Sequence, residues 1–224
     1  MERKSVIKTR RRSLGILVMV CGVITLVLAA ALYAYNIWDD DRAAKAAQQT
    51  AQELYTIIAA DKVAELEETF SLSTQQAAIK DNAAEAADSG NEAAKVVLGG
   101  VSYIGIIDLP TLGLTLPVAE TLSYPKLKVS PCRFTGDINK GALVIAAHNY
   151  QRHFGGISNL KKGDVVIMTD MDGFEHSYCV ESIITVEPTN VQTVVASGYD
   201  LTLFTCTYNG QARVVVRCIE STVV

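Results

Sequence analysis

The chain has 224 residues, enough for one ordinary domain with accessory segments and too few for two full catalytic domains. Hydrophobic residues make up 49% of it, and the formal net charge is −4. The first 12 residues hold six Lys or Arg against Glu2, a sum of +5, so the remainder totals −9. Because the only dense cation cluster adjoins an apolar run, the composition excludes a general nucleic-acid-binding surface.

Residues 13–38 contain no charged side chain and exceed the roughly 20 apolar residues that cross a bilayer as a helix. The basic tail, residues 1–12, precedes this run, and three aspartates at 39–41 follow it. The positive-inside rule therefore predicts a single-pass anchor in the cell membrane, with a cytoplasmic N-terminus and an extracellular remainder. A cleaved signal peptide is the alternative, but its apolar region usually has only about 7–15 residues.

Residues 39–98 are rich in Ala, Glu, Lys and Gln, with Leu54, Ile57 and Ile58 at helical spacing. This composition predicts a helical stalk or linker that acts as a spacer. More polar residues within 71–90 predict a break there.

Residues 99–224 consist of short β-branched runs separated by Gly, Pro, Asn and Asp. No long amphipathic helix separates the runs. We therefore expect a mainly β domain, an antiparallel barrel or sandwich, with a single core.

The five cysteines form no CxxC pair and show no zinc-ligand spacing, so we predict no metal site. A Cys179–Cys218 or Cys132–Cys179 disulfide remains open on sequence alone. Buried free cysteine is the interpretation we favour.

Two predicted strands run into reactive residues, His148 and Cys206. Asn209-Gly210 predicts a two-residue type I′ hairpin turn, which places Cys206 directly opposite Arg213. Arg217 then lies opposite Thr202, roughly 13 Å further along the strand. Strand alternation turns Cys218 away from Cys206 and predicts a small core residue there.

A thiol, an imidazole and a guanidinium together suit acyl transfer through a thioester. A neighbouring cation lowers the pKa of a thiol, and an imidazole protonates a leaving amine. A fixed Arg stabilises the oxyanion that forms when a peptide carbonyl is attacked. Residue types alone leave a structural role for these side chains open.

Three segments resemble the signature motifs of sortases. TLFTC (Thr202–Cys206) resembles their nucleophile motif, GALVIAAHN (Gly141–Asn149) the strand that ends in their catalytic histidine, and RVVVR (Arg213–Arg217) the strand that begins with their catalytic arginine. Order and spacing agree, and the resemblance extends over nearly all of residues 99–224. Residues 159–166 and 186–191 add further similarity.

The resemblance implies a closed eight-stranded β-barrel and a cysteine transpeptidase that cleaves an LPxTG-like sorting signal. Carried over by position, Cys206 is the nucleophile, His148 the acid/base group, Arg213 the oxyanion or substrate clamp, and Thr205 a substrate-positioning hydroxyl. An inward-facing strand residue is the alternative for Thr205. His153 and His176 receive no catalytic role, and His153 is a solvated or packing residue.

The partners implied are surface proteins with a C-terminal sorting signal and an amine acceptor, such as a lipid-linked peptidoglycan precursor or a pilin lysine. No cofactor is predicted, while calcium dependence and the sortase subclass stay open. Two other functions fit the sequence: a cysteine endopeptidase that uses water as acceptor, and a non-enzymatic surface adaptor.

Overall fold

The computed structural model describes residues 2–76, 94–196 and 198–221, with side chains described for 15–64 and from 94 onward within these ranges. Its helices and strands are α1 (Glu2–Gln76), β1 (Val96–Leu98), β2 (Val101–Leu109), η1 (Pro110–Leu112), β3 (Leu114–Ala119), α2 (Tyr124–Leu127), β4 (Cys132–Asp137), β5 (Gly141–Ala146), η2 (Phe154–Asn159), β6 (Val165–Asp170), β7 (Glu175–Val186), α3 (Val191–Val194), β8 (Leu201–Cys206) and β9 (Arg213–Glu220). The chain divides into two compact units, residues 1–42 and 43–224.

The first unit contains the apolar part of α1. Of the helices described, α1 alone has the length and composition needed to cross a membrane, and its apolar stretch lies near the N-terminus. Large apolar side chains from Ile16 to Trp38 are exposed, with no protein surface covering them. A continuous exposed apolar surface of this kind marks a membrane or protein contact, which fits the predicted anchor.

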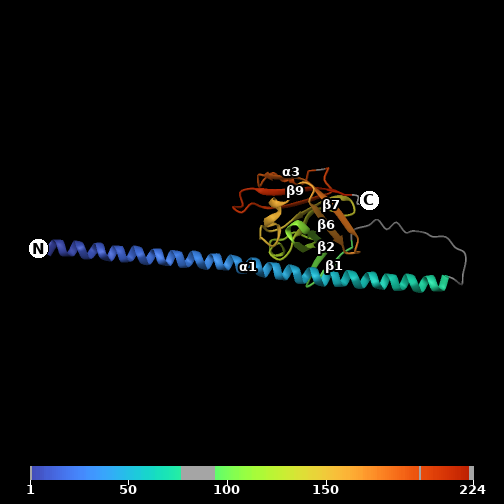
Figure 1. Cartoon of the computed structure of the whole chain (residues 1–224), viewed down its shortest axis with the longest axis horizontal. Helices are drawn as coiled ribbons and strands as arrows, with labels where there is room; N and C mark the ends of the chain where they lie inside the picture. The colour runs from blue at the N-terminus through green and yellow to red at the C-terminus, as the bar shows by residue number, and fades with distance from the viewer. Residues whose placement is uncertain (1, 77–93, 197, 222–224) are drawn as a thin grey trace. The chain divides into compact units, whose positions relative to one another are not determined.

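The second unit is built on a closed barrel (Figure 1). Its strands follow the order β2-β3-β4-β5-β8-β9-β7-β6, and β6 pairs with β2 to close the ring. The short β1 pairs with β2 outside that ring of eight. Neighbouring strands are antiparallel except for β3–β4 and β5–β8, which are parallel. The eight-stranded closed barrel implied by the resemblance is therefore confirmed.

Alternation along each strand separates the barrel interior from its outer face. Along β8, Leu201 and Leu203 belong to the main core, whereas Phe204 packs in a different, outer cluster. The same division holds on β9, where Val216 is in the core and Val215 is in the outer cluster. Successive side chains of a strand point to opposite faces, so a residue's parity decides which face it occupies.

The part of α1 that follows residue 42 packs against the barrel. Ala47, Ala51, Leu54 and Ile58 recur every three or four residues and are buried, and the last three pack with Tyr103 and Ile106 of β2. The small alanines let the helix approach the sheet closely. This described part of the predicted stalk is therefore helical, as expected, but it also forms part of the domain's core.

Two polar contacts fix this helix segment further. The Tyr55 hydroxyl donates to Asp108 at 2.7 Å, and burial together with that carboxylate raises the pKa of Tyr55 to about 12. Lys62 donates to the Gly173 carbonyl at 2.7 Å. Gly173 has a φ of +79°, and a Cβ there would lie 2.8 Å from Ile58, so both its conformation and its space favour glycine.

The break predicted within 71–90 falls mostly outside the described residues. α1 continues to Gln76, and the described chain resumes at residue 94.

Candidate active site

Cys206 and His148 are brought together by the parallel pairing of β5 and β8. The paired residues differ by 58 in number throughout, from Leu143 and Leu201 to Ala146 and Phe204. The same offset continues past the end of β5, because Thr205 bonds to the Ala147 carbonyl and Asn149 to the Thr207 carbonyl. By this offset His148, two residues beyond the end of β5, falls level with Cys206 at the end of β8.

Arg213 lies on the other side of Cys206. β8 and β9 pair in the predicted register, with Cys206 opposite Arg213 and Thr202 opposite Arg217. The order across the sheet is therefore His148, Cys206, Arg213. The sequence predicted this position of Arg213 correctly.

The turn that joins β8 and β9 differs from the predicted type I′ hairpin. Gly210 N–H donates to the Thr207 carbonyl at 2.8 Å, and Asn209 lacks the positive φ that a type I′ turn requires. The Thr207 hydroxyl instead accepts the Ala212 N–H at 3.0 Å. A threonine side chain thus replaces a backbone partner, and the connection becomes longer without shifting the register.

Parity places all three residues on the outer face of the barrel. Cys206 shares the parity of Phe204, Arg213 that of Val215, and His148 that of Val144, and these three apolar residues belong to one outer cluster. Cys206, His148 and Arg213 are each partly exposed. The sulfur is thus outside the packed interior.

The His148 ring is held by its neighbours along the chain. Nδ1 lies 3.0 Å from Asn149 Oδ1, and the Asn149 amide nitrogen donates to the Thr207 carbonyl at 3.4 Å. An amide oxygen only accepts hydrogen bonds, so this arrangement puts the hydrogen on Nδ1 and leaves Nε2 free to exchange a proton. Tyr150 stacks on the imidazole at a centroid distance of 4.2 Å.

Thr205 faces inward, with the parity of Leu201 and Leu203. It is buried, and its hydroxyl donates to the Ala147 carbonyl at 2.9 Å. This bond ties β8 to the chain just before His148. The inward-facing alternative for Thr205 agrees with this geometry.

A groove of about 270 Å³ opens beside Cys206 on the outer face. Its lining is largely apolar and comes from the outer face itself, from the β3–β4 connection and from the β7–β8 connection: Leu122, Leu127, Phe134, Ala146, Ala147, Pro188, Val191, Val194, Phe204, Thr205, Cys206 and Arg213. Arg213 is the only charged residue in this lining.

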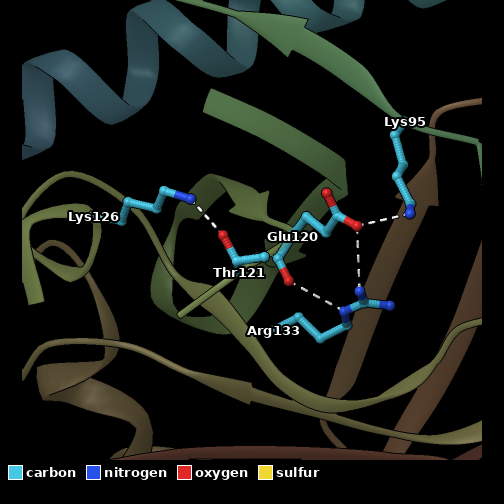
Figure 2. Close-up of polar contacts among 5 residues, drawn as sticks. All are labelled: Lys95, Glu120, Thr121, Lys126 and Arg133. Carbon is cyan, nitrogen blue, oxygen red and sulfur yellow. Dashed lines mark hydrogen bonds and ion pairs between the residues drawn. The ribbon is translucent and has the colours of Figure 1, made fainter. Parts of the chain in front are cut away.

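The β3–β4 connection, which provides Leu122 and Leu127, begins at a cluster of charged residues (Figure 2). Glu120 accepts from Lys95 at 2.7 Å, and Arg133 bonds both to its carboxylate and, at 3.1 Å, to its carbonyl. The hydrogen bond from Lys95, with help from Ser102 and Arg133, lowers the pKa of Glu120. Lys126 of α2 bonds to the Thr121 hydroxyl one residue further on.

Two cysteines are absent from the groove lining: Cys218 packs in the barrel core, and Cys132 packs in the cluster that α1 forms with β2. Cys132 and Cys218 are fully buried; burial raises the pKa of both thiols, that of Cys218 to about 12. The predicted inward orientation of Cys218 is confirmed. All five cysteines are free, so neither disulfide considered from the sequence is present.

The other two histidines are placed in different surroundings. His153 is completely buried, and neither ring nitrogen makes a hydrogen bond of good geometry, although the backbone of Ala43 lies close enough to act on its pKa; it packs and is not solvated. Burial, and secondarily His148, lowers its pKa to about 4. His176 contacts the buried Asp170 at 3.2 Å, on a strand remote from Cys206. Among the described side chains, no group of three or more His, Cys, Asp or Glu is arranged to hold a metal ion.

Sequence reasoning missed Asn149. Its position next to His148 was the available signal, but which way its amide points depends on Thr207, a residue 58 positions away.

Comparison with known proteins identifies the domain. Residues 107–221, just over half of the chain, match the family model described as the sortase domain. A search of curated proteins found no match.

Solved structures give the same picture at the level of fold. Sortase C1 from Streptococcus agalactiae is 23% identical over 56% of this chain and 70% of its own, with a TM-score of 0.50. Sortase A from Corynebacterium diphtheriae is 22% identical over 55% of this chain and 63% of its own, also with a TM-score of 0.50. Sortase C from Streptococcus pneumoniae is 27% identical over 53% and 68%, with a TM-score of 0.48.

Proposed function

Since the chain belongs to the sortase family, we propose that it is a membrane-anchored transpeptidase that cleaves an LPxTG-like sorting signal and joins it to an amine. The observation that carries this proposal is the position of Cys206. It pairs with Arg213 of β9, lines an apolar groove, and falls level with His148 when the offset between β5 and β8 is continued.

In the first step the Cys206 thiolate attacks the carbonyl carbon of the threonine in the sorting signal. Negative charge develops on the carbonyl oxygen, and Arg213 stabilises it. His148, protonated at both nitrogens, gives its Nε2 proton to the nitrogen of the following residue. The C–N bond then breaks, which leaves a thioester on Cys206 and frees the C-terminal fragment as an amine.

In the second step an acceptor amine attacks the thioester. His148 Nε2 takes the proton from the attacking nitrogen, the C–S bond breaks, and the Cys206 thiolate leaves. The product carries a new amide bond. Acceptors that fit this step are a lipid-linked peptidoglycan precursor and a pilin lysine.

The surroundings support these roles. Asn149 holds Nδ1 of His148, so the imidazole exchanges its proton only through Nε2. Thr205 ties β8 to the chain before His148 and acts on the substrate indirectly, by fixing the spacing between base and nucleophile. The apolar groove suits the leucine and proline of a sorting signal. No step requires a cofactor.

The apolar part of α1 would hold the enzyme in the cell membrane. The basic tail at 1–12 and the aspartates at 39–41 favour a cytoplasmic N-terminus and an extracellular barrel. Sorting signals and amine acceptors are both met on that side of the membrane.

Mass spectrometry of the detergent-solubilised full chain tests the proposal. Incubation with LPxTG-type peptides should give an acyl adduct on Cys206, and added amine should convert it to an amide product. Hydrolysis that amine does not affect would contradict transfer and indicate an endopeptidase. No adduct with any peptide would indicate a non-enzymatic adaptor.

A further inference from the structure

The second arginine of β9, Arg217, has no place in the chemistry described above. We propose that Arg217 is a positioning residue that holds the α3 wall of the groove and thereby sets how tightly the enzyme binds its peptide. The peptide substrate in this inference rests on the proposed function. The contacts between Arg217 and α3 do not depend on it.

Both polar contacts of Arg217 reach the β7–β8 connection. Nη2 donates to the Thr193 carbonyl at 2.8 Å, and the guanidinium lies over the Tyr199 ring, 4.8 Å from its centroid. Nη1 also approaches the Tyr199 hydroxyl at 3.5 Å. One side chain thus binds the connection at two points, one within α3 and one just before β8.

The segment that Arg217 holds forms a wall of the groove. Val191 and Val194 of α3 both line it, and Val194 also packs against Val144 and Val215 on the outer face. Thr193, whose carbonyl Arg217 binds, lies between these two valines in sequence. A shift of this carbonyl therefore moves the residues that contact the substrate.

The other described hydrogen bonds of this segment are local, such as Val195 N–H to the Val191 carbonyl at 3.0 Å. Among the described contacts, α3 has one capping residue, Asn190, which accepts from the Thr193 backbone and hydroxyl. A helix of four residues has almost no stability of its own. We infer that burial of Val194 and the contacts of Arg217 supply the remaining stability of α3.

Arginine is suited to this task in a way that lysine is not. Its planar guanidinium stacks on a ring while its edge donates to a carbonyl, whereas an ammonium is a single point of charge. No carboxylate pairs with Arg217 among the described residues, and its Nε is buried without a partner. Its contacts therefore serve the connection and not a salt bridge.

If Arg217 only positions the groove wall, its replacement should change KM and leave kcat nearly unchanged. Arg217→Lys should raise KM for a sorting peptide about tenfold, because a charge-assisted hydrogen bond and a cation–π contact together contribute on that order. The value of kcat should stay within about twofold, since Cys206, His148 and Arg213 are untouched. Tyr199→Ala should behave like Arg217→Lys, while Tyr199→Phe, which keeps the ring, should resemble wild type.

Hydrogen exchange gives a measurement that needs no substrate. In Arg217→Lys, amides of residues 191–195 should exchange about tenfold faster or more, while amides of β8 and β9 stay protected. The full chain is used in detergent, and Arg133→Lys, at the Glu120 end of the groove, is the matched control that should leave 191–195 unchanged.

Unchanged exchange at 191–195 together with unchanged KM would overturn the inference. Faster exchange throughout the barrel would also overturn it, because Arg217 would then be a general stabilising residue. If wild type cleaves no peptide, the proposed function fails. Exchange at 191–195 still tests whether Arg217 holds α3 in place. Arg217→Ala, which risks misfolding, is unnecessary.

Discussion

The rim of the groove and the buried parts of the domain contain the same two reactive residue types in different surroundings. At the rim, Cys206 and His148 are partly exposed. Cys218 lies in the barrel core and His153 lies near the backbone of Ala43 in α1; both are fully buried, and burial raises the pKa of the thiol to about 12 and lowers that of the imidazole to about 4. Both shifts favour the neutral form.

For the two cysteines, the difference teaches that strand parity decides which thiol is buried and which one a solute can reach. Cys206 and Cys218 lie on adjacent strands near opposite ends of one ladder. A thiol that stays protonated at neutral pH is a poor nucleophile. A buried residue of this kind serves packing, whereas Cys206 is partly exposed and lines the groove.

The largest expected effect separates the two cysteines. Cys206→Ala should abolish the acyl adduct with a sorting peptide, because no other accessible thiol adjoins the groove. Cys218→Ala should keep the adduct and lose roughly 1–2 kcal/mol of unfolding free energy, from the cavity left in the core. Intact mass and denaturant unfolding measure the two effects. An adduct that persists in Cys206→Ala would show that Cys206 is not the nucleophile.

The next effect concerns the charge at the rim. Arg213→Ala should lower kcat on the order of 10²–10³, as expected when one oxyanion donor is lost. Arg213→Lys keeps the charge but not the planar guanidinium. Its kcat should lie between those of Arg213→Ala and wild type. Single-turnover acylation rates measure this. A mild effect of Arg213→Ala would show that another donor meets the oxyanion.

The smallest effect sharpens the contrast between the two histidines. His153 has a folded pKa of about 4, below its usual 6.5. The unfolded chain therefore binds more protons between these values, and stability is complete above pH 6.5 and declines as pH falls toward 4. A pKa difference of about 2.5 corresponds to at most about 3 kcal/mol.

Denaturant unfolding of wild type and His153→Met at pH 7 and pH 4.5 measures this loss. The variant lacks the buried imidazole, so its stability should fall less across the same range. Equal losses in the two proteins would mean that His153 is not the group that titrates.

Much of the site follows from local sequence. Alternation and the Asn209-Gly210 signal were enough to place Cys206 opposite Arg213 and to turn Cys218 inward. The turn type was wrong: the Thr207 carbonyl accepts from Gly210 and the Thr207 hydroxyl accepts from the Ala212 N–H, so Thr207 and Ala212 close a longer loop. Such competition between side chain and backbone leaves no mark on the hydrophobic pattern.

Contacts between distant segments were less predictable. The parallel pairing of β5 with β8 joins residues 58 apart, across two intervening strands, and the expectation of an antiparallel barrel or sandwich did not include it. The packing of α1 on β2 also escaped notice. Alanine promotes a helix whether exposed or buried, so Ala47 and Ala51 reveal their burial only once β2 lies against them.

The long sequence separation between His148 and Cys206 also affects how the protein folds during synthesis. The segment between their strands contains β6 and β7, and β8 and β9 are synthesised after the other strands of the barrel. Until that long loop closes, neither His148 nor Arg213 is held level with Cys206. The arrangement proposed for catalysis therefore exists only once the barrel has closed.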